Sequence, residues 1–398
     1  MCAARYRMPR SPLLFVLLTV FIDLMGGSLL VPVLPYLVER FRSDALTIGL
    51  LTSSFSIAQF LATPVLGTLS DRFGRRPVLL ICVFGTSVGY FLFALANQLW
   101  VLFLARTIAG ATGGVVSTAQ AYIADTTPPE KRTGAFGLIG AAFGLGFILG
   151  PAIGGALVHF DLNAPVYFAG ALALFNLLLG SFTLKESLPP EKRQRRSGLD
   201  ALNPFKQLSR LVGDGKIRGL LVGFFLFNFA FAGFTSIFAL SIKDRFGWGP
   251  AQVVWVFAFI GVVSTFVQGW LIRQLVPRFG EPRLALSGLG CICFAFALIA
   301  LIPAGSWLYL TQGVLALGVG LATPSLRGLL SNTATASDQG RVLGGAQSLV
   351  SLGQVLGPLA ASSSYDYLGQ LVPFWGGAVT LLLALGFVFL NLRVLAVR

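Results

Sequence analysis

The chain alternates between long apolar stretches and short polar connections. Twelve stretches reach about 20 residues, the length that an α-helix needs to cross the hydrocarbon of a bilayer. They are apolar on all sides and lack the strict alternation of a membrane β-strand. The pattern predicts an all-α integral membrane fold with twelve helices, over residues 12–38, 46–69, 77–96, 99–123, 133–158, 164–184, 218–242, 250–272, 283–303, 306–330, 341–362 and 371–394.

Composition excludes a water-soluble fold. Of the 398 residues, 55% are hydrophobic and 11% are charged, and the mean hydropathy is +0.81, whereas soluble domains carry roughly 25% charged residues. The net charge is +14, and the basic residues are unevenly distributed, because the loops on one side contain only four of them, Arg40, Arg42, Lys243 and Arg245. The positive-inside rule then predicts that both termini are cytoplasmic, and we expect the protein to lie in the plasma membrane, as a bacterial inner-membrane protein. The charge reports topology in the lipid bilayer, and we expect no nucleic acid partner.

The chain nearly repeats itself in its second half. Leu149-Gly150-Pro151 returns 207 positions later as Leu356-Gly357-Pro358, and Arg72-Phe73-Gly74 returns 206 positions later as Arg278-Phe279-Gly280. The polar segment 185–217 separates the two copies and predicts a cytoplasmic linker, in which Asn203–Val212 is expected to form a short amphipathic helix. We predict two pseudo-symmetric six-helix bundles, 1–184 and 218–398. This is the plan of a secondary transporter, whose substrate site lies between the halves.

The most specific local motif lies between the second and third helices. Gly67-Thr68-Leu69-Ser70-Asp71-Arg72-Phe73-Gly74-Arg75-Arg76-Pro77 resembles the loop signature of the major facilitator superfamily, G-x-L-x-D-R-x-G-R-R. We expect Asp71 to meet the positive end of a neighbouring helix, the eleventh, and Arg75 or Arg76 to reach Asp125. Such contacts would break when the halves rock apart. The alternative is a basic loop that only sets topology. The candidate switch residues are Gly67, Asp71, Arg72, Gly74, Arg75, Arg76 and Asp125.

A second candidate site combines the first and fourth helices. Arg106 lies inside a membrane helix, where a charge is costly and needs protein or water around it. Asp23 is the one acid in the middle of any predicted helix. Desolvation raises the pKa of a buried carboxyl group, and a nearby cation lowers it. Proton coupling requires this combination. We predict that Asp23 takes up and releases a proton under the influence of Arg106; the alternative is a fixed ion pair that orients the two helices.

The fifth helix carries glycines at four-residue spacing and a Gly-Pro step. Small residues at this spacing let membrane helices approach closely, and the proline removes one backbone donor and bends the helix. The segment resembles the antiporter signature G-x-x-x-G-P-x-x-G-G of the drug/proton antiporter branch, which implies efflux, although helix packing alone would also explain it. The motif residues are Gly146, Gly150, Pro151, Gly154 and Gly155.

Along essentially its full length the chain is similar to twelve-helix drug/proton antiporters, above all the tetracycline/proton antiporter group. The shared stretches are Asp23 to Gly26, Pro32 to Pro35, Ser70 to Leu80, Ile123 to Thr127 and Phe143 to Gly155. The chain also departs from that group. Gly89 beside Tyr90 stands where the group has an acid in helix 3, Gly290 or Cys291 where it has one in helix 9, and Ser264 near its helix-8 histidine. The resemblance implies the fold and the role of Asp23, but it does not extend to tetracycline–metal chemistry.

Neutral polar and aromatic side chains supply the expected substrate cavity. Aromatic residues make up 12% of the chain, 35 of them Phe, and an apolar cavity with scattered amides suits lipophilic or amphipathic substrates. The candidates are Gln59, Gln120, Asn228, Phe231, Phe234, Thr235, Gln347 and Gln354.

The sequence favours a monomeric transporter that exchanges protons for a small-molecule substrate, with no cofactor and no metal. The alternatives are a symporter or facilitator for sugars, lipids or other metabolites, and a non-transporting receptor. An enzyme is not expected, because the predicted helices hold no cluster of residues for acid–base or metal chemistry.

Overall fold

The computed structural model describes residues 10–42, 44–193, 217–333 and 339–396, and within them the regular structure is entirely helical. The predicted surface helix Asn203–Val212 lies outside the described residues. The first half contains α1 (Arg10–Leu30), α2 (Leu34–Glu39), α3 (Ala45–Phe73), α4 (Arg75–Ala94), α5 (Leu99–Ala111), α6 (Val115–Thr126), α7 (Pro129–Val158), α8 (Ala164–Thr183) and the 3₁₀ turn η1 (Pro190–Lys192). The second half contains α10 (Arg218–Phe246), α11 (Pro250–Phe266), the π-helical turn η3 (Val267–Leu271), α12 (Ile272–Leu301), the 3₁₀ turn η4 (Gly305–Trp307), α13 (Leu308–Asn332), α14 (Gln339–Leu368) and α15 (Val372–Ala396).

The described helices account for twelve membrane crossings. Ten segments are long and apolar enough to span a bilayer, and one of them, Pro250–Leu301, has 52 residues, enough for two crossings at about 20 residues each. The more polar α14, with 30 residues, adds the twelfth. The prediction of an all-α fold with twelve spanning helices is confirmed.

The repeated Arg-Phe-Gly motif forms the same turn in both halves. Gly74, between α3 and α4, has a φ of 108°, and Gly280, inside α12, has a φ of 75° and divides that helix at a kink. Glycine adopts positive φ without the steric cost that a side chain brings. The sequence repeat therefore reflects a repeated backbone turn, which ends a spanning helix at equivalent places.

The fourth predicted helix differs from expectation, because 99–123 is not one continuous helix. Thr112-Gly113-Gly114 separates α5 from α6. Adjacent glycines weaken a helix by roughly 1 kcal/mol each relative to alanine, and the chain turns here through short bonds, from Gly113 N to Gly110 O (2.9 Å) and from Gly114 N to Thr112 O (2.8 Å). Gln59 Nε2, on α3, donates to the freed Gly113 carbonyl at 2.9 Å. A side chain thus satisfies a backbone group that lipid could not.

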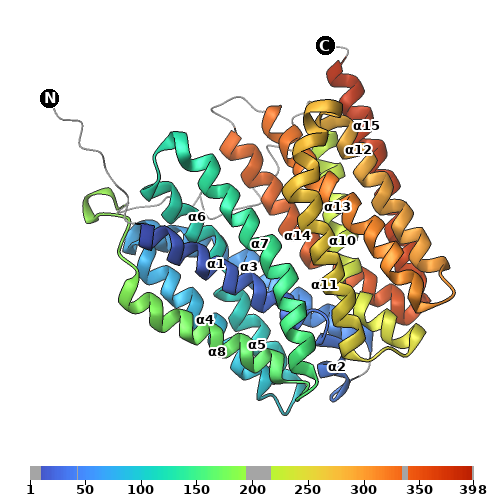
Figure 1. The fold of residues 1–398 in the computed structure, drawn as a ribbon, viewed down its shortest axis with the longest axis horizontal. Coiled ribbons are helices and arrows are strands. Elements are labelled where there is room, and N and C mark those ends of the chain that lie inside the picture. The colour runs from blue at the N-terminus through green and yellow to red at the C-terminus, as the bar shows by residue number, and fades with distance from the viewer. Residues whose placement is uncertain (1–9, 43, 194–216, 334–338, 397–398) are drawn as a thin grey trace.

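The helices form two bundles, one of α1 and α3–α8 and the other of α10–α15, with α3 and α7 of the first packed on α14 and α11 of the second (Figure 1). Close approach at these contacts depends on small residues: a Cβ at Gly49 of α3 would overlap Ser362 of α14, and a Cβ at Gly261 of α11 would press on the Phe147 carbonyl of α7.

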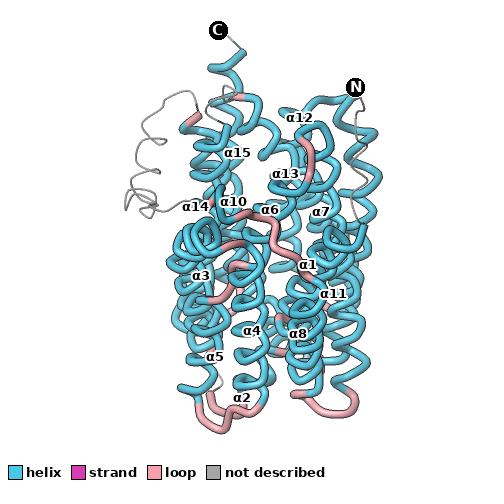
Figure 2. Tube along the Cα trace, turned by 90° about the vertical axis from the view of Figure 1, so that its left-hand side faces the viewer, coloured by secondary structure: helices cyan, strands magenta, loops and turns pink. Residues whose placement is uncertain are grey.

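At the end of the molecule that carries α2 (Figure 2), named here the α2 end, polar contacts also join the bundles. Tyr36 Oη donates to Trp248 O at 2.6 Å, and Lys243 pairs with Glu39. The Asp366 carboxylate, at the end of α14, accepts from Ala45 N (3.1 Å) and Leu46 N (2.7 Å) at the start of α3. An acid from one bundle thus caps a helix N-terminus of the other, where anions are favoured, and the molecule is closed at its α2 end.

Candidate functional site

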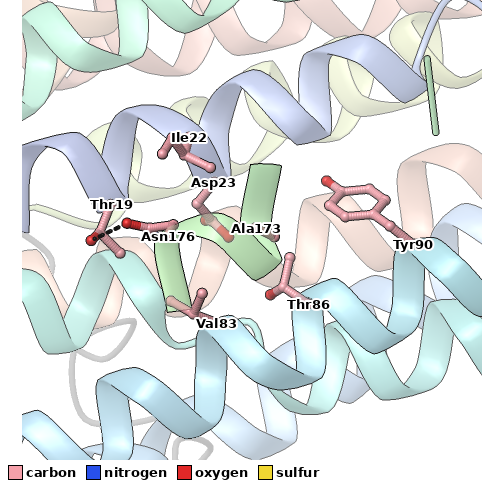
Figure 3. Close-up of a pocket in the computed structure, with 8 residues that line it drawn as sticks. All are labelled: Thr19, Ile22, Asp23, Val83, Thr86, Tyr90, Ala173 and Asn176. Carbon is pink, nitrogen blue, oxygen red and sulfur yellow. Dashed lines mark hydrogen bonds between the residues drawn. The ribbon is translucent and has the colours of Figure 1, made fainter. Parts of the chain in front are cut away.

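Asp23 borders a small internal cavity of the first bundle (Figure 3). The cavity, of about 10 Å³, approaches the space that one water molecule needs. Asp23 on α1 is half-buried and points toward α4 and α8. The lining residues are Thr19, Ile22, Asp23, Val83, Thr86, Tyr90, Ala173 and Asn176. The carboxyl group therefore faces protein and a cavity.

Neutral polar groups share this cavity with the carboxylate. Thr19 Oγ1 lies 3.2 Å from Asn176 Oδ1, to which it can donate, and 3.0 Å from Phe15 O. Sequence reasoning missed Thr19, although it lies one helical turn before Asp23 and so shares its face. It also missed Thr86 and Tyr90, which are four residues apart on one face of α4. Among the described residues, Asp23 takes part in no ion pair.

The predicted pairing of Asp23 with Arg106 is absent from the described contacts. The Arg106 guanidinium instead lies over the Phe55 ring, with its central carbon 4.4 Å from the ring centre. A cation over an aromatic face is stabilised by the ring quadrupole, more so when desolvated. The buried Nε of Arg106 has no hydrogen-bond partner. The two charges are thus held separately, on α1 and on α5.

The loop motif forms a polar network inside the first bundle. Arg75 is its centre: Nη1 lies 2.6 Å from Asp71 Oδ1 and Nε lies 2.9 Å from Asp125 Oδ2. The predicted contact with Asp125 is thus made by Arg75. Asp71 pairs with Arg75, and no ion pair or hydrogen bond between Asp71 and α14, its expected partner, is found among the described side chains. A described contact between α3 and α14 lies nearer the α2 end, from Ser53 Oγ to Val355 O (2.8 Å).

Glu186, which the sequence analysis did not single out, anchors the same loop. Its carboxylate accepts from the backbone N of Arg75 (2.8 Å) and of Arg76 (3.3 Å) at the start of α4. Gly74 leaves room for this carboxylate, since a Cβ there would overlap it. Arg76 Nη2 donates to Ser181 O on α8 at 2.7 Å. The other two motif residues have fewer contacts: Arg72 is exposed and lies over Phe73, and Gly67 has open space beside it.

The glycine motif of α7 is a packing surface. A Cβ at Gly146 would lie 3.1 Å from Met25 N, and one at Gly150 would overlap Ser28 Oγ and lie 2.9 Å from Met25 O. Ser28 Oγ donates to Gly146 O at 2.8 Å. Further along the helix, Gly154 faces Leu29 of α1 and Gly155 faces Val254 of α11, in the other bundle. Pro151 lies buried inside α7. This motif therefore binds α7 both to the helix that carries Asp23 and to the second bundle.

The predicted cavity residues have different surroundings. Gln59 supports the break between α5 and α6, while Gln120, Gln347 and Gln354 are exposed. Asn228 Nδ2 donates to Phe224 O within α10, and Thr235 Oγ1 donates to Ala232 O. Phe231 is half-buried, whereas Phe234 is only 4% exposed and packs against Phe238, Phe296 and Phe374 in the core of the second bundle.

Comparisons with known proteins identify the family of the chain. A sequence profile of the Major Facilitator Superfamily matches residues 16–314 and 275–396. The class C tetracycline resistance protein of Escherichia coli is 34% identical over 358 residues, which cover 89% of this chain and 90% of the relative. Multidrug resistance protein 2 of Bacillus subtilis is 29% identical over 378 residues, 94% of this chain and 93% of the relative.

Solved structures show the same fold. The human organic anion transporter MFSD10 (TETRAN) superposes with a TM-score of 0.74 and 29% identity, over 95% of this chain and 99% of that one. These matches cover nearly the whole chain. The fold is consistent with them, since it has twelve membrane crossings in two packed bundles. The chain is therefore a multi-pass membrane protein that belongs to the Major Facilitator Superfamily of transporters.

Proposed function

We propose that this protein is a secondary active transporter that exports small lipophilic or amphipathic compounds in exchange for protons. The observation that carries the proposal is the position of Asp23, whose carboxyl group lies in the middle of an apolar helix, borders a cavity and points toward α4 and α8. Acids in such positions are costly and mark proton and ion pathways. The relatives named for tetracycline and multidrug resistance support export of drug-like compounds.

In this proposal Asp23 binds a proton when its cavity communicates with the outside and releases it toward the cytoplasm. The bundles alternate between two closures around the site. The described structure is closed at the α2 end, which the positive-inside rule places outside, with both termini in the cytoplasm. We infer that the two bundles comprise residues 1–184 and 218–398. We also infer that the protein functions as a monomer in a bacterial inner membrane.

The loop around Arg75 is proposed to act as the conformational switch. Here Asp71 and Asp125 both pair with Arg75, so the charged side chains of the loop find their ion-pair partners within the first bundle. When the cytoplasmic side closes, Asp71 is freed to meet the start of α14, where the positive end of the helix attracts an anion. This contact between Asp71 and the start of α14 breaks each time the bundles separate again on the cytoplasmic side.

Replacing Asp366 with Asn should loosen the α2-end closure, because the amide removes the charge that caps α3 from the other bundle. A charge at a helix N-terminus contributes about 0.3–2 kcal/mol, enough to shift the ratio of the two closures several-fold. Distances between spin labels at residues 40 and 367, in a background without native cysteines, should move toward longer values. Asp44→Asn is the matched control, since Asp44 caps the same helix from its own bundle. Equal effects of the two substitutions would contradict a latch between bundles.

A vesicle assay tests the function itself. Everted membrane vesicles with an acidified interior should lose their proton gradient when tetracycline or the lipophilic dye ethidium is added, if either compound is exchanged for protons. Uptake that proceeds with protons in the same direction, or without any gradient, would instead establish a symporter or a facilitator. Solute binding without any flux would establish a receptor.

A further inference from the structure

The cavity beside Asp23 contains a phenol that the transport proposal does not use. Tyr90, on α4, lines this cavity together with Asp23 (Figure 3). Its ring packs on Gly26, which lies on α1 one turn after Asp23. A Cβ at Gly26 would lie 2.8 Å from the Tyr90 hydroxyl oxygen and 3.1 Å from Cε2. The absence of a side chain at Gly26 therefore makes the space that holds the hydroxyl against the helix of Asp23.

The same segment of α4 also reaches the helix of Arg106. Gly89 packs on α5, where a Cβ would lie 3.1 Å from the Ala105 carbonyl oxygen and 2.9 Å from Ala109 Cβ. Asp23 and Arg106 form no ion pair in the described part of the chain. The α4 segment that carries Tyr90 lies against the helices of both residues, with the Tyr90 ring on α1 and Gly89 on α5. The buried Nε of Arg106 lacks a partner.

The other groups around Asp23 provide no comparable link. On α4, Cys82 shares a face with Thr86 and Tyr90, but a thiol is a weak hydrogen-bond donor. The α8 helix contributes the neutral Asn176 and Ala173, and α7 packs on α1 through glycines. A phenol hydroxyl donates one hydrogen bond and also accepts, so it can serve a carboxylate on one side and a guanidinium on the other.

We propose that Tyr90 is a positioning residue for proton exchange at Asp23, donating to the deprotonated carboxylate while it accepts from Arg106. The inference rests on the proposed proton coupling at Asp23. When Asp23 takes up a proton, the hydroxyl loses its charged acceptor and the link to Arg106 relaxes. Binding of one proton at α1 is thereby felt on α5, across α4.

Infrared difference spectroscopy of the purified protein tests this without any substrate, so its result does not depend on whether transport is observed. Bands of a protonated carboxyl that are present in wild type and absent in Asp23→Asn report the protonation of Asp23 as pH is varied. Loss of a hydrogen bond donated to a charged group should move the Asp23 midpoint upward by about one to two pH units in Tyr90→Phe. Gly26→Ala, which displaces the phenol, should move it in the same direction.

Two matched controls and one double variant complete the test. Gly27→Ala, with nothing within 4 Å of its new Cβ, and Tyr167→Phe on α8 should leave the midpoint in place. Arg106→Gln should raise the midpoint in wild type, but by less in the Tyr90→Phe background, because coupled residues are non-additive. An unchanged midpoint in Tyr90→Phe, an effect of Gly27→Ala equal to that of Gly26→Ala, or additive shifts with Arg106→Gln would each overturn the proposal.

Discussion

Replacing Asp23 with Asn should abolish proton-driven export while leaving the protein folded and able to exchange substrate. Asparagine has nearly the same shape as aspartate but binds no proton in the relevant range, so the transport cycle loses its coupled ion. We expect the rate of uptake driven by a pH gradient into everted vesicles to fall by about two orders of magnitude, the scale that loss of a proton-transfer group has in enzymes. Substrate exchange at equal pH on both sides should persist, because it needs no net proton movement.

Asp161→Asn is the control for that experiment. Asp161 lies exposed in the connection between α7 and α8, where it accepts from the backbone N of Asn163, so its substitution should leave gradient-driven uptake near the wild-type rate. Loss of both driven uptake and exchange in Asp23→Asn would point to a damaged fold. Full gradient-driven uptake in that variant would reject Asp23 as the coupling group.

Replacing Gly150 with Ala should be the most damaging single-methyl substitution in α7. A Cβ at this position overlaps Ser28 Oγ and lies 2.9 Å from the Met25 carbonyl oxygen, and backbone atoms cannot move aside as a flexible side chain does. Overpacking of this kind costs roughly 1–3 kcal/mol. It would also move α7 away from the helix that carries Asp23. Thermal unfolding in detergent should therefore shift to lower temperature, and transport should fall with it.

Gly140 provides the comparison within the same helix, because a Cβ there meets nothing within 4 Å. Gly140→Ala should match or slightly exceed wild-type stability, since alanine favours the helix more than glycine does by about 1 kcal/mol. Equal stability of the two alanine variants would mean that the glycines of the motif do not set the distance between α1 and α7.

Features that depend on a single helix or loop could be predicted from the sequence. Apolar length is enough to count spanning helices, and an acid surrounded by apolar neighbours stands out without any contact information, which is why Asp23 was found. A contact of Arg75 or Arg76 with Asp125 was also predicted, because these residues lie at the same membrane edge, and Arg75 makes it. The α5–α6 break had a visible signal in Gly113-Gly114, but a pair of glycines is compatible with a continuous helix until a partner such as Gln59 supports the opening.

Features that depend on the rotation and pairing of distant helices could not be predicted. Composition suggested a counter-charge for Arg106, yet the ring of Phe55 occupies that role because α3 packs beside α5. Asp366 caps α3 although it lies 321 positions from Ala45 and 320 from Leu46 in the sequence. No local sequence pattern indicates this contact. The same holds for Phe234, whose spacing on α10 suits a cavity or a core equally well, and which the neighbouring helices bury.

The most direct test of the account is substrate-driven proton movement in reconstituted vesicles that contain either the wild type or Asp23→Asn at equal density. A compound that wild-type everted vesicles accumulate is added to liposomes with an imposed pH gradient and an internal pH-sensitive dye. The account predicts rapid collapse of the gradient with the wild type and none above the empty-vesicle leak with Asp23→Asn. Equal collapse with both proteins would place the exchanged proton on another group and contradict the central claim.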